Sequence, residues 1–136
     1  MIKQISVYTE NKKGASRKIL GVLSKENINV LGFVNNDSGE FGTARLIVED
    51  NKTEEAYKLL SNEGYLCRQS GVIGVELEDK PGSLEELFTA IDNMNINIDY
   101  VYIGYRRENC MPLILVHCGS MDIVEEVLIG QGFKVY

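Results

Sequence analysis

Two sets of polar residues with the same spacing occur along this chain, and each could bind a small ionic molecule. In each set a carboxamide or carboxylate residue stands three positions before a glycine, and an asparagine follows 18 positions after that residue. The sets are Asn11, Gly14 and Asn29, and Asp79, Gly82 and Asn97. Their side-chain oxygens can accept hydrogen bonds from an ammonium group, and backbone amides at a helix start can donate to a carboxylate. The pattern predicts a site for an α-amino acid in each copy.

The two sets belong to an internal repeat with an offset of 68 residues and no gap. Asn11-Lys12-Lys13-Gly14 aligns with Asp79-Lys80-Pro81-Gly82, and Asn27-Ile28-Asn29-Val30 aligns with Asn95-Ile96-Asn97-Ile98. We therefore expect two domains, residues 1–70 and 71–136. A fused pair builds its own two-fold interface, and interfaces between domains are common places for ligands.

Each copy begins with a pattern typical of a strand followed by a helix. Ile5 and Val7 alternate with polar residues in the first copy, as a half-buried strand requires. A helical stripe then follows the glycine turn, and in the second copy it consists of Leu84, Leu87, Phe88 and Ile91. The Asn-Ile-Asn segments are expected to end this helix and to start the next strand.

The second part of each copy predicts a hairpin, a helix and a short last strand. Turn-like residues at 36–39 and 106–109 separate the second strands from strands at 43–48 and 113–116. Thr53 and Ser120 are expected to cap a second helix. Gly64 and Gly132 occupy the positions expected of helix-terminating glycines.

The resulting element order, β-α-β-β-α-β in each copy, indicates an α+β fold. We expect two ferredoxin-like domains in tandem, with antiparallel sheets and both helices on one face of each sheet. Residues 98–105 are apolar on both faces of their strand, so the uncovered sheet face favours an oligomer. The expected ligand site combines the glycine turn with the start of the second strand, and its residues are Asn11, Gly14, Ala15, Asn29, Val30, Leu31, Asp79, Gly82, Ser83, Asn97 and Ile98.

The segments Glu10–Gly14 and Glu78–Gly82, each followed by a helix and by Asn-Ile-Asn, resemble the ACT domain. The resemblance covers both copies and implies a ferredoxin-like regulatory module that binds amino acids at interfaces between domains. In the similar serine-binding domain of phosphoglycerate dehydrogenase, one asparagine precedes the turn glycine and another opens the second strand. These match Asn11 and Asn29 here, with Asp79 and Asn97 in the second copy. Thr9 and Leu77 stand where that domain has a histidine.

The whole chain resembles stand-alone proteins that consist of two ACT domains, some of which have names taken from acetolactate synthase regulation. This resemblance implies a non-catalytic allosteric sensor, most simply a homodimer, that binds a free amino acid and signals to an enzyme of amino-acid biosynthesis. It implies no cofactor. The identity of the amino acid stays open.

Charge and composition narrow the classes of partner. Residues 1–70 hold 10 Lys or Arg and 9 Asp or Glu, whereas residues 71–136 hold 4 and 11. The acidic second half opposes nucleic-acid binding, which needs clustered cations. No apolar run has the length of a membrane span, so we expect a cytoplasmic protein. Cys67, Cys110 and Cys118 are too dispersed for a metal site and are expected in the core or in strands.

Two other functions fit parts of the sequence. An acylphosphatase-like enzyme would use Arg17 with Asn29 or Asn36, although Glu85 replaces the arginine in the second copy. An RNA-binding sheet would use the segment Gly39-Glu40-Phe41-Gly42, but the expected stacking aromatics are absent from the strand that follows. The repeated turn chemistry favours the amino-acid sensor over both.

Overall fold

The computed structural model describes the backbone of residues 1–136 and every side chain except those of Asp37 and Ser38. The chain divides into two compact units. Lys3–Ser70 form the copy-one unit, while Gly71–Tyr136 together with Met1–Ile2 form the copy-two unit. The N-terminal ammonium group makes an ion pair of 3.0 Å with Glu125 within the copy-two unit. The first two residues therefore belong to the same compact unit as the second repeat. The limits 1–70 and 71–136 remain our proposal for the two domains.

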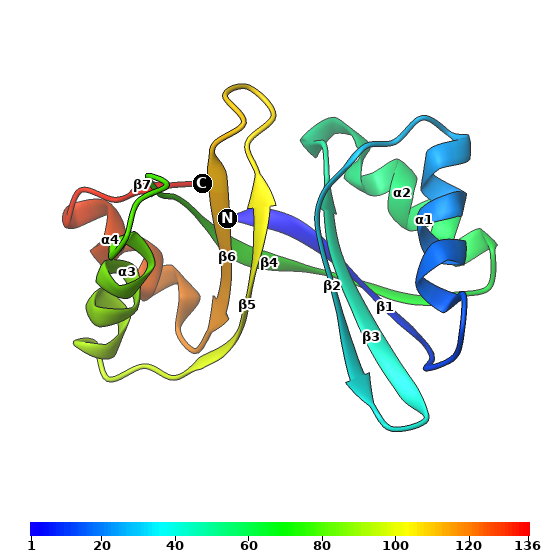
Figure 1. Cartoon of the computed structure of the whole chain (residues 1–136), viewed down its shortest axis with the longest axis horizontal. Helices are drawn as coiled ribbons and strands as arrows, with labels where there is room; N and C mark the ends of the chain where they lie inside the picture. The colour runs from blue at the N-terminus through cyan, green and yellow to red at the C-terminus, as the bar shows by residue number, and fades with distance from the viewer. The chain divides into compact units, whose positions relative to one another are not determined.

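The copy-one unit contains one antiparallel sheet with two helices (Figure 1). Strand β3 lies between β1 and β2, and β4 pairs with β1. This is the strand arrangement of a ferredoxin-like domain. The elements are β1 (Ile2–Glu10), α1 (Ala15–Lys25), β2 (Val30–Ser38), β3 (Phe41–Val48), a short 3-10 helix η1 (Asp50–Lys52), α2 (Thr53–Asn62) and β4 (Leu66–Glu76).

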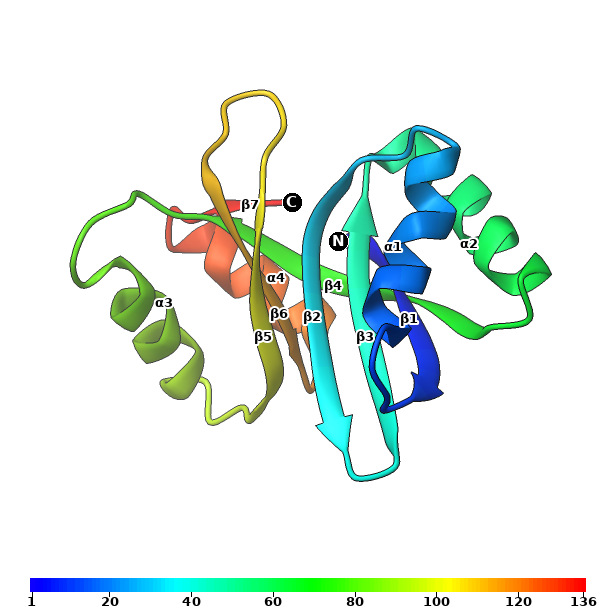
Figure 2. The same ribbon diagram turned by 45° about the vertical axis from the view of Figure 1, so that its right-hand side comes forward.

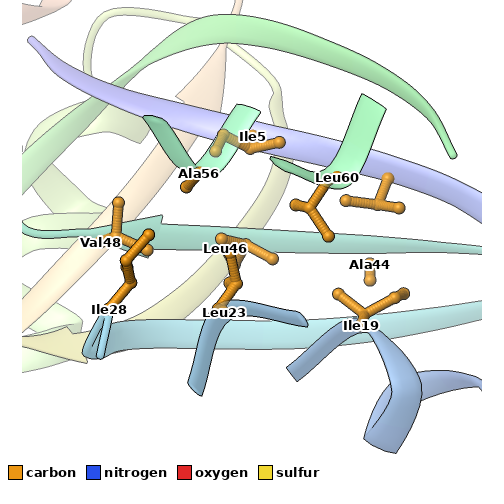
Figure 3. Packing of buried hydrophobic residues seen from close by; sticks show 10 residues of the cluster. Ile5, Ile19, Leu23, Ile28, Ala44, Leu46, Val48, Ala56 and Leu60 are labelled. Carbon is orange, nitrogen blue, oxygen red and sulfur yellow. The ribbon is translucent and has the colours of Figure 1, made fainter. Parts of the chain in front are cut away.

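A single hydrophobic cluster joins both helices of the copy-one unit to its strands. Ile19 and Leu23 of α1 and Leu60 of α2 point toward the strand residues Ile5 and Leu46 (Figure 3). All five side chains are completely buried. Because the apolar residues of both helices enter one cluster, α1 and α2 lie on the same face of the sheet, as the ferredoxin-like plan predicts.

The copy-two unit repeats this plan. Strand β6 lies between β5 and the last part of β4, and a short β7 pairs with β4. Leu87 and Ile91 of α3 and Leu128 of α4 are completely buried in one cluster with β4 and β6. The elements are α3 (Ser83–Asp92), β5 (Ile98–Tyr105), β6 (Pro112–Cys118), α4 (Met121–Gly130) and β7 (Lys134–Val135).

The repeated asparagines and glycines end helices as expected. Asn27 and Asn95 both adopt φ +56°, and Gly64 and Gly132 both adopt φ +92°. Positive φ is accessible to glycine and tolerated by asparagine, so these residues turn the chain out of the helix. The local conformation at each helix end is thus the same in both copies.

Several local expectations are wrong. Strand β2 continues through residue 38, because Gly39 with φ +79° and Glu40 form a two-residue hairpin turn. Thr53 is buried as the first residue of α2, and Ser120 adopts φ +51°, so neither side chain caps its helix. Strand β4 is continuous across the repeat boundary instead of ending as a short strand in the first copy. Leu84 of the expected apolar stripe is exposed.

Among the cysteines, Cys118 is buried, Cys67 packs against the copy-one core, and Cys110 is exposed in the loop after β5. The expectation of a core or strand position is therefore wrong for Cys110, whose φ of +56° belongs to a turn. Burial raises the pKa of the Cys67 and Cys118 thiols. None of the helices in the described part of the chain is long and apolar enough to cross a membrane.

Candidate functional site

The turn between β1 and α1 has the same geometry as the turn that precedes α3. Gly14 has φ +83° and Gly82 has φ +89°, a region that an L side chain rarely adopts. The Ala15 amide donates to the carbonyl of Lys12 at 3.2 Å, and the Ser83 amide donates to that of Lys80 at 3.3 Å. The amides of the next two residues in each helix have no intrahelical acceptor, because the residue four positions earlier lies outside the helix. Each turn thus presents amide donors and the positive end of a helix dipole to an anion.

Asn11 and Asp79 differ in their surroundings. The Asn11 side chain donates to the Gly39 carbonyl at 2.9 Å, and its backbone amide donates to the Glu40 carbonyl at 2.8 Å. Asn11 therefore ties its turn to the β2–β3 hairpin, with its side-chain oxygen left as an acceptor. The Asp79 carboxylate is exposed and has no hydrogen bond or ion pair among the side chains that the structure describes.

The start of the second strand is also repeated. Asn29 and Asn97 are exposed, and Val30 and Ile98, which follow them, pack against the core of their own unit. The pairing register of each strand then shifts by one residue, at Leu31 in β2 and at Asp99 in β5. Bulges redirect side chains and are frequent beside binding sites. Both copies therefore present an asparagine next to a bulge.

The structure does not bring Asn11 and Asn29 together within one unit. Helix α1 lies between them and, at 1.5 Å per residue, spans about 16 Å. The sheet separates them as well, because Glu10 pairs with one end of β3 and Val30 with the other. Both views show the ends of α1 at opposite ends of β2 (Figure 1, Figure 2). In the copy-two unit, α3 likewise separates Asp79 from Asn97. A ligand that contacts both types of residue needs two copies of the domain.

The residues that an acylphosphatase-like site or an RNA-binding strand would use lie in or beside α1, β2 and β3. Arg17 is exposed in the first turn of α1, at the opposite end of that helix from Asn29, while Asn36 lies on β2 opposite Thr43. The region that would act as an RNA-binding strand has Phe41 exposed at the start of β3, with Leu46 buried in the core. Within the described residues, no three His, Cys, Asp or Glu side chains are grouped as metal ligands.

Each unit has a cavity beside its glycine turn. The copy-one cavity, of about 690 Å³, is lined by Tyr8, Thr9, Glu10, Lys12, Ala15, Lys18, Phe41, Gly42, Thr43, Gly64, Tyr65 and Leu66. The copy-two cavity, of about 420 Å³, is lined by Glu76, Leu77, Glu78, Lys80, Ser83, Glu86, Met111, Gly132, Phe133 and Lys134. All ten of these lie 68 positions after a residue of the copy-one cavity. The repeat thus conserves a cavity at one place in the domain while its lining differs.

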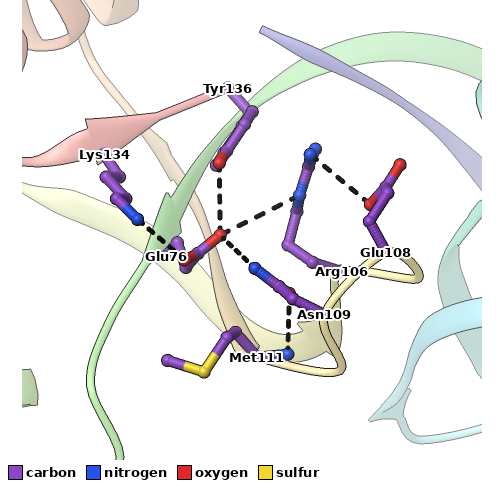
Figure 4. Close-up of polar contacts among 7 residues, drawn as sticks. All are labelled: Glu76, Arg106, Glu108, Asn109, Met111, Lys134 and Tyr136. Carbon is purple, nitrogen blue, oxygen red and sulfur yellow. Dashed lines mark hydrogen bonds and ion pairs between the residues drawn. The ribbon is translucent and has the colours of Figure 1, made fainter.

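In the copy-two unit this place contains a buried carboxylate. The Glu76 side chain, only 4% exposed, accepts hydrogen bonds of 3.2 Å from Asn109 and from the Tyr136 hydroxyl (Figure 4). Lys134 Nζ lies 3.5 Å from its other oxygen, and Arg106 Nε lies 4.0 Å away while its guanidinium covers the Tyr136 ring. The surrounding donors satisfy the carboxylate, as burial of a charge requires.

These contacts lower the pKa of Glu76. The largest cause is the hydrogen bond from Asn109, and the Tyr136 hydroxyl and Lys134 act in the same direction, whereas burial opposes them. The folded state therefore binds this proton less readily than the unfolded state, so Glu76 contributes stability above its ordinary pKa of 4.5. That contribution is lost as the pH falls below 4.5 toward the folded-state pKa.

We expect Glu76→Gln to remove part of the acid sensitivity of the protein. The free energy of unfolding, measured in urea at neutral pH and at several values below 4.5, should fall less steeply with acid in this variant than in the wild type. Glu78→Gln is the matched control, because Glu78 is exposed and neighbours the same cavity. Equal acid dependence in Glu76→Gln and the wild type would contradict the assignment.

Sequence reasoning missed the cavities and the Glu76 cluster. Ser16 and Asn35 were missed as well, although their side chains hydrogen-bond at 2.9 Å and join α1 to β2 near the Asn11 turn. The alignment of the two copies contained one usable signal for the cavities. Tyr8 aligns with Glu76, an exchange of an aromatic for a charged residue within otherwise matching apolar strands.

Comparisons with known proteins agree with this architecture. The sequence model of the family described as "ACT domain pair" matches residues 1–134. A crystal structure of a protein from Bacteroides thetaiotaomicron has 28% identity and a TM-score of 0.86, with 99% of this chain and 91% of that chain covered. The ligand-free regulatory subunit of aspartate kinase from Thermus thermophilus shares the fold, with 15% identity, a TM-score of 0.64 and coverage of 94% and 90%. No curated protein matches the sequence.

Proposed function

Because this chain belongs to the family of ACT domain pairs, we propose that it is a non-catalytic regulatory protein that binds a free amino acid between ACT domains. The observation that supports this function best is the repetition of two different local structures. Both copies have a glycine turn with amide donors at a helix start, and both have an exposed asparagine beside a strand bulge. Conservation of both structures between diverged copies is expected if they bind the same kind of ligand.

The proposed site takes the glycine turn from one ACT domain and the start of the second strand from another. Amides of the turn bind the carboxylate of the amino acid, and the Asn11 oxygen or the Asp79 carboxylate accepts from its ammonium group. Asn29 or Asn97 completes the site from the second domain. The separation of Asn11 from Asn29 within one unit supports this arrangement. The exposed apolar side chains of Val101, Ile103 and Tyr105 on β5 support a homodimer as the functional form.

Binding at such an interface provides a means of regulation. An amino acid that binds one arrangement of the domains more tightly shifts the population toward that arrangement, and the size of the shift is bounded by the difference in affinity. A partner enzyme of amino-acid metabolism would sense that arrangement. The similarity to a regulatory subunit of aspartate kinase supports a partner of this kind, as does the resemblance to proteins named for acetolactate synthase regulation.

The test is a titration of the purified protein with each common amino acid, followed by thermal shift and calorimetry. At least one amino acid should raise the melting temperature, because a ligand that binds the folded state stabilises it by mass action. Asn29→Ala and Asn97→Ala should each weaken that binding about tenfold or more if its site is used, since hydrogen bonds to charged groups contribute about 1.5–3 kcal/mol.

Asn62→Ala is the matched control, because Asn62 is an exposed asparagine at the end of α2 and outside the proposed site. It should bind the amino acid as the wild type does. The proposal fails if no amino acid changes the melting temperature, or if both asparagine variants retain wild-type affinity.

A further inference from the structure

The copy-one cavity has apolar residues where the copy-two cavity has its charged cluster. Tyr8 aligns with Glu76, Phe41 with Asn109, and Leu66 with Lys134. In the copy-two unit, Asn109 and Lys134 both contact the Glu76 carboxylate. The aligned side chains Tyr8, Phe41 and Leu66 cannot form such a polar cluster, and the copy-one cavity that they line is the larger of the two.

The apolar walls of the copy-one cavity are unusually exposed. Phe41 is 63% and Leu66 is 72% exposed, and Tyr8, on the adjacent strand β1, is exposed as well. Tyr65 contributes a fourth apolar side chain, which also packs against the core of the unit. A cluster of large exposed apolar side chains around a cavity indicates a surface that binds another molecule.

The charges of the two cavities are opposite. The copy-one cavity has one carboxylate, Glu10, and two ammonium groups, Lys12 and Lys18, which give a net charge of +1. Glu10 and Lys12 form an ion pair of 3.0 Å, so Lys18 supplies the excess charge. Among the described side chains, no carboxylate lies within ion-pair distance of Lys18. Glu86 replaces Lys18 in the copy-two cavity, where three carboxylates and two ammonium groups give −1.

We propose that the copy-one cavity binds a small organic monocarboxylate with an apolar body, such as an aromatic or branched acid without an amino group. Lys18 binds the carboxylate, while Tyr8, Phe41 and Leu66 contact the apolar body. Its volume of about 690 Å³ is within the range of about 300–1,000 Å³ found for small-molecule sites. A free amino acid would place its own ammonium group near Lys18, where the two positive charges repel each other. A monocarboxylate that has no amino group therefore complements the net charge of +1 in the cavity better than an amino acid does.

This site shares Ala15 of the glycine turn with the proposed amino-acid site but differs from it in its other residues. Asn11 and Asn29 do not line the copy-one cavity, which is lined instead by the start of β3 and by the turn that precedes β4. The protein would thereby respond to two ligands of different charge. By linkage, each ligand would alter the affinity for the other if both favour or oppose the same domain arrangement.

The experiment uses phenylacetate as the probe, with benzylamine as a probe of similar size and opposite charge. Calorimetry of the wild-type protein should show binding of phenylacetate and no binding of benzylamine. Lys18→Glu should weaken phenylacetate binding about fivefold or more, because it reverses the excess charge. Glu86→Lys, the reciprocal exchange in the copy-two cavity, is the matched control and should leave the binding unchanged.

A second variant removes apolar side chains from the copy-one cavity without changing its charge. Phe41→Asn combined with Leu66→Asn changes two exposed side chains, so folding should be retained, and circular dichroism checks this. The loss of apolar contact should weaken phenylacetate binding about tenfold or more. The amino acid found in the screen above should bind this variant as it binds the wild type.

Three results would overturn the proposal: no phenylacetate binding at millimolar concentration, equal binding of benzylamine, or unchanged binding by both cavity variants. Sedimentation velocity tests a second copy of the chain as the occupant. A wild-type dimer that dissociates in the Phe41→Asn, Leu66→Asn variant would assign the surface to self-association and reject the small-molecule site. Failure of this proposal can be told apart from failure of the amino-acid proposal. The latter is tested by the amino-acid affinity of Asn29→Ala and Asn97→Ala, and these two substitutions leave the copy-one cavity unchanged.

Discussion

Leu87→Asp is expected to unfold the copy-two unit. Leu87 is completely buried in α3 among residues of β4, β6 and α4, where a carboxylate has no donor to replace water. Burial of an unpaired charge is among the few single changes that cost more than about 4 kcal/mol. That loss is a large part of the stability of a small domain, which is about 5–15 kcal/mol in total. Amide exchange should therefore show loss of protection in α3, β6 and α4.

The same helix contains the matched control. Leu84 lies three residues before Leu87 and is 42% exposed, so Leu84→Asp places the same charge within reach of water. This variant should lose less than about 1 kcal/mol. The pair separates the effect of burial from the effect of a new negative charge in the acidic second copy. Equal losses in both variants would show that the assigned buried face of α3 is wrong.

Leu46→Ala should lower the free energy of unfolding by about 2–5 kcal/mol. Leu46 is completely buried at the middle of β3, directly opposite Ile5 of β1 and Phe33 of β2. Truncation removes apolar contact and leaves a cavity that the strands on both sides prevent from closing. Urea unfolding followed by circular dichroism measures the change.

Leu66→Ala is the control for this loss, because it makes the same substitution at an exposed leucine of β4 and should change stability by about 0.5 kcal/mol or less. It also bears on the proposed carboxylate site, since Leu66 lines the copy-one cavity. A variant with wild-type stability and weaker phenylacetate binding would connect Leu66 with the ligand. A small loss in Leu46→Ala would mean that β3 is not the centre of the copy-one core.

The two proposed sites use the divergence of the repeat in different ways. The glycine turns and the strand bulges are the same in both copies, which suits one amino acid bound by equivalent structures. The cavities beside these turns have opposite net charge. In the copy-two unit a cluster around Glu76 lines the smaller cavity, and in the copy-one unit the larger cavity is the proposed carboxylate site. Under this proposal, divergence after duplication separates a structural role from a binding role at one position of the fold.

The sequence by itself determined the features that depend on local conformation. Asn27, Asn95, Gly64 and Gly132 end helices because a left-handed residue is required there, and asparagine and glycine adopt it at low cost. The alternation of apolar residues in strands and their helical spacing determined the element order, because each period assigns the apolar residues to one face of its element. The repeat offset then gave the two copies their common plan.

Only the tertiary structure decided which residues meet. The spacing of Asn11 and Asn29 suggested one site in each copy, but the pairing of β1 and β2 with opposite ends of β3 separates them. The hydrogen bonds of Glu76 to Asn109 and Tyr136 join residues that are 33 and 60 positions apart. Such contacts form because the packing of helices on the sheet brings distant segments together, and the free energy of that packing depends on the whole core and not on any local pattern. The two cavities, and the opposite charges that distinguish them, are consequences of that packing.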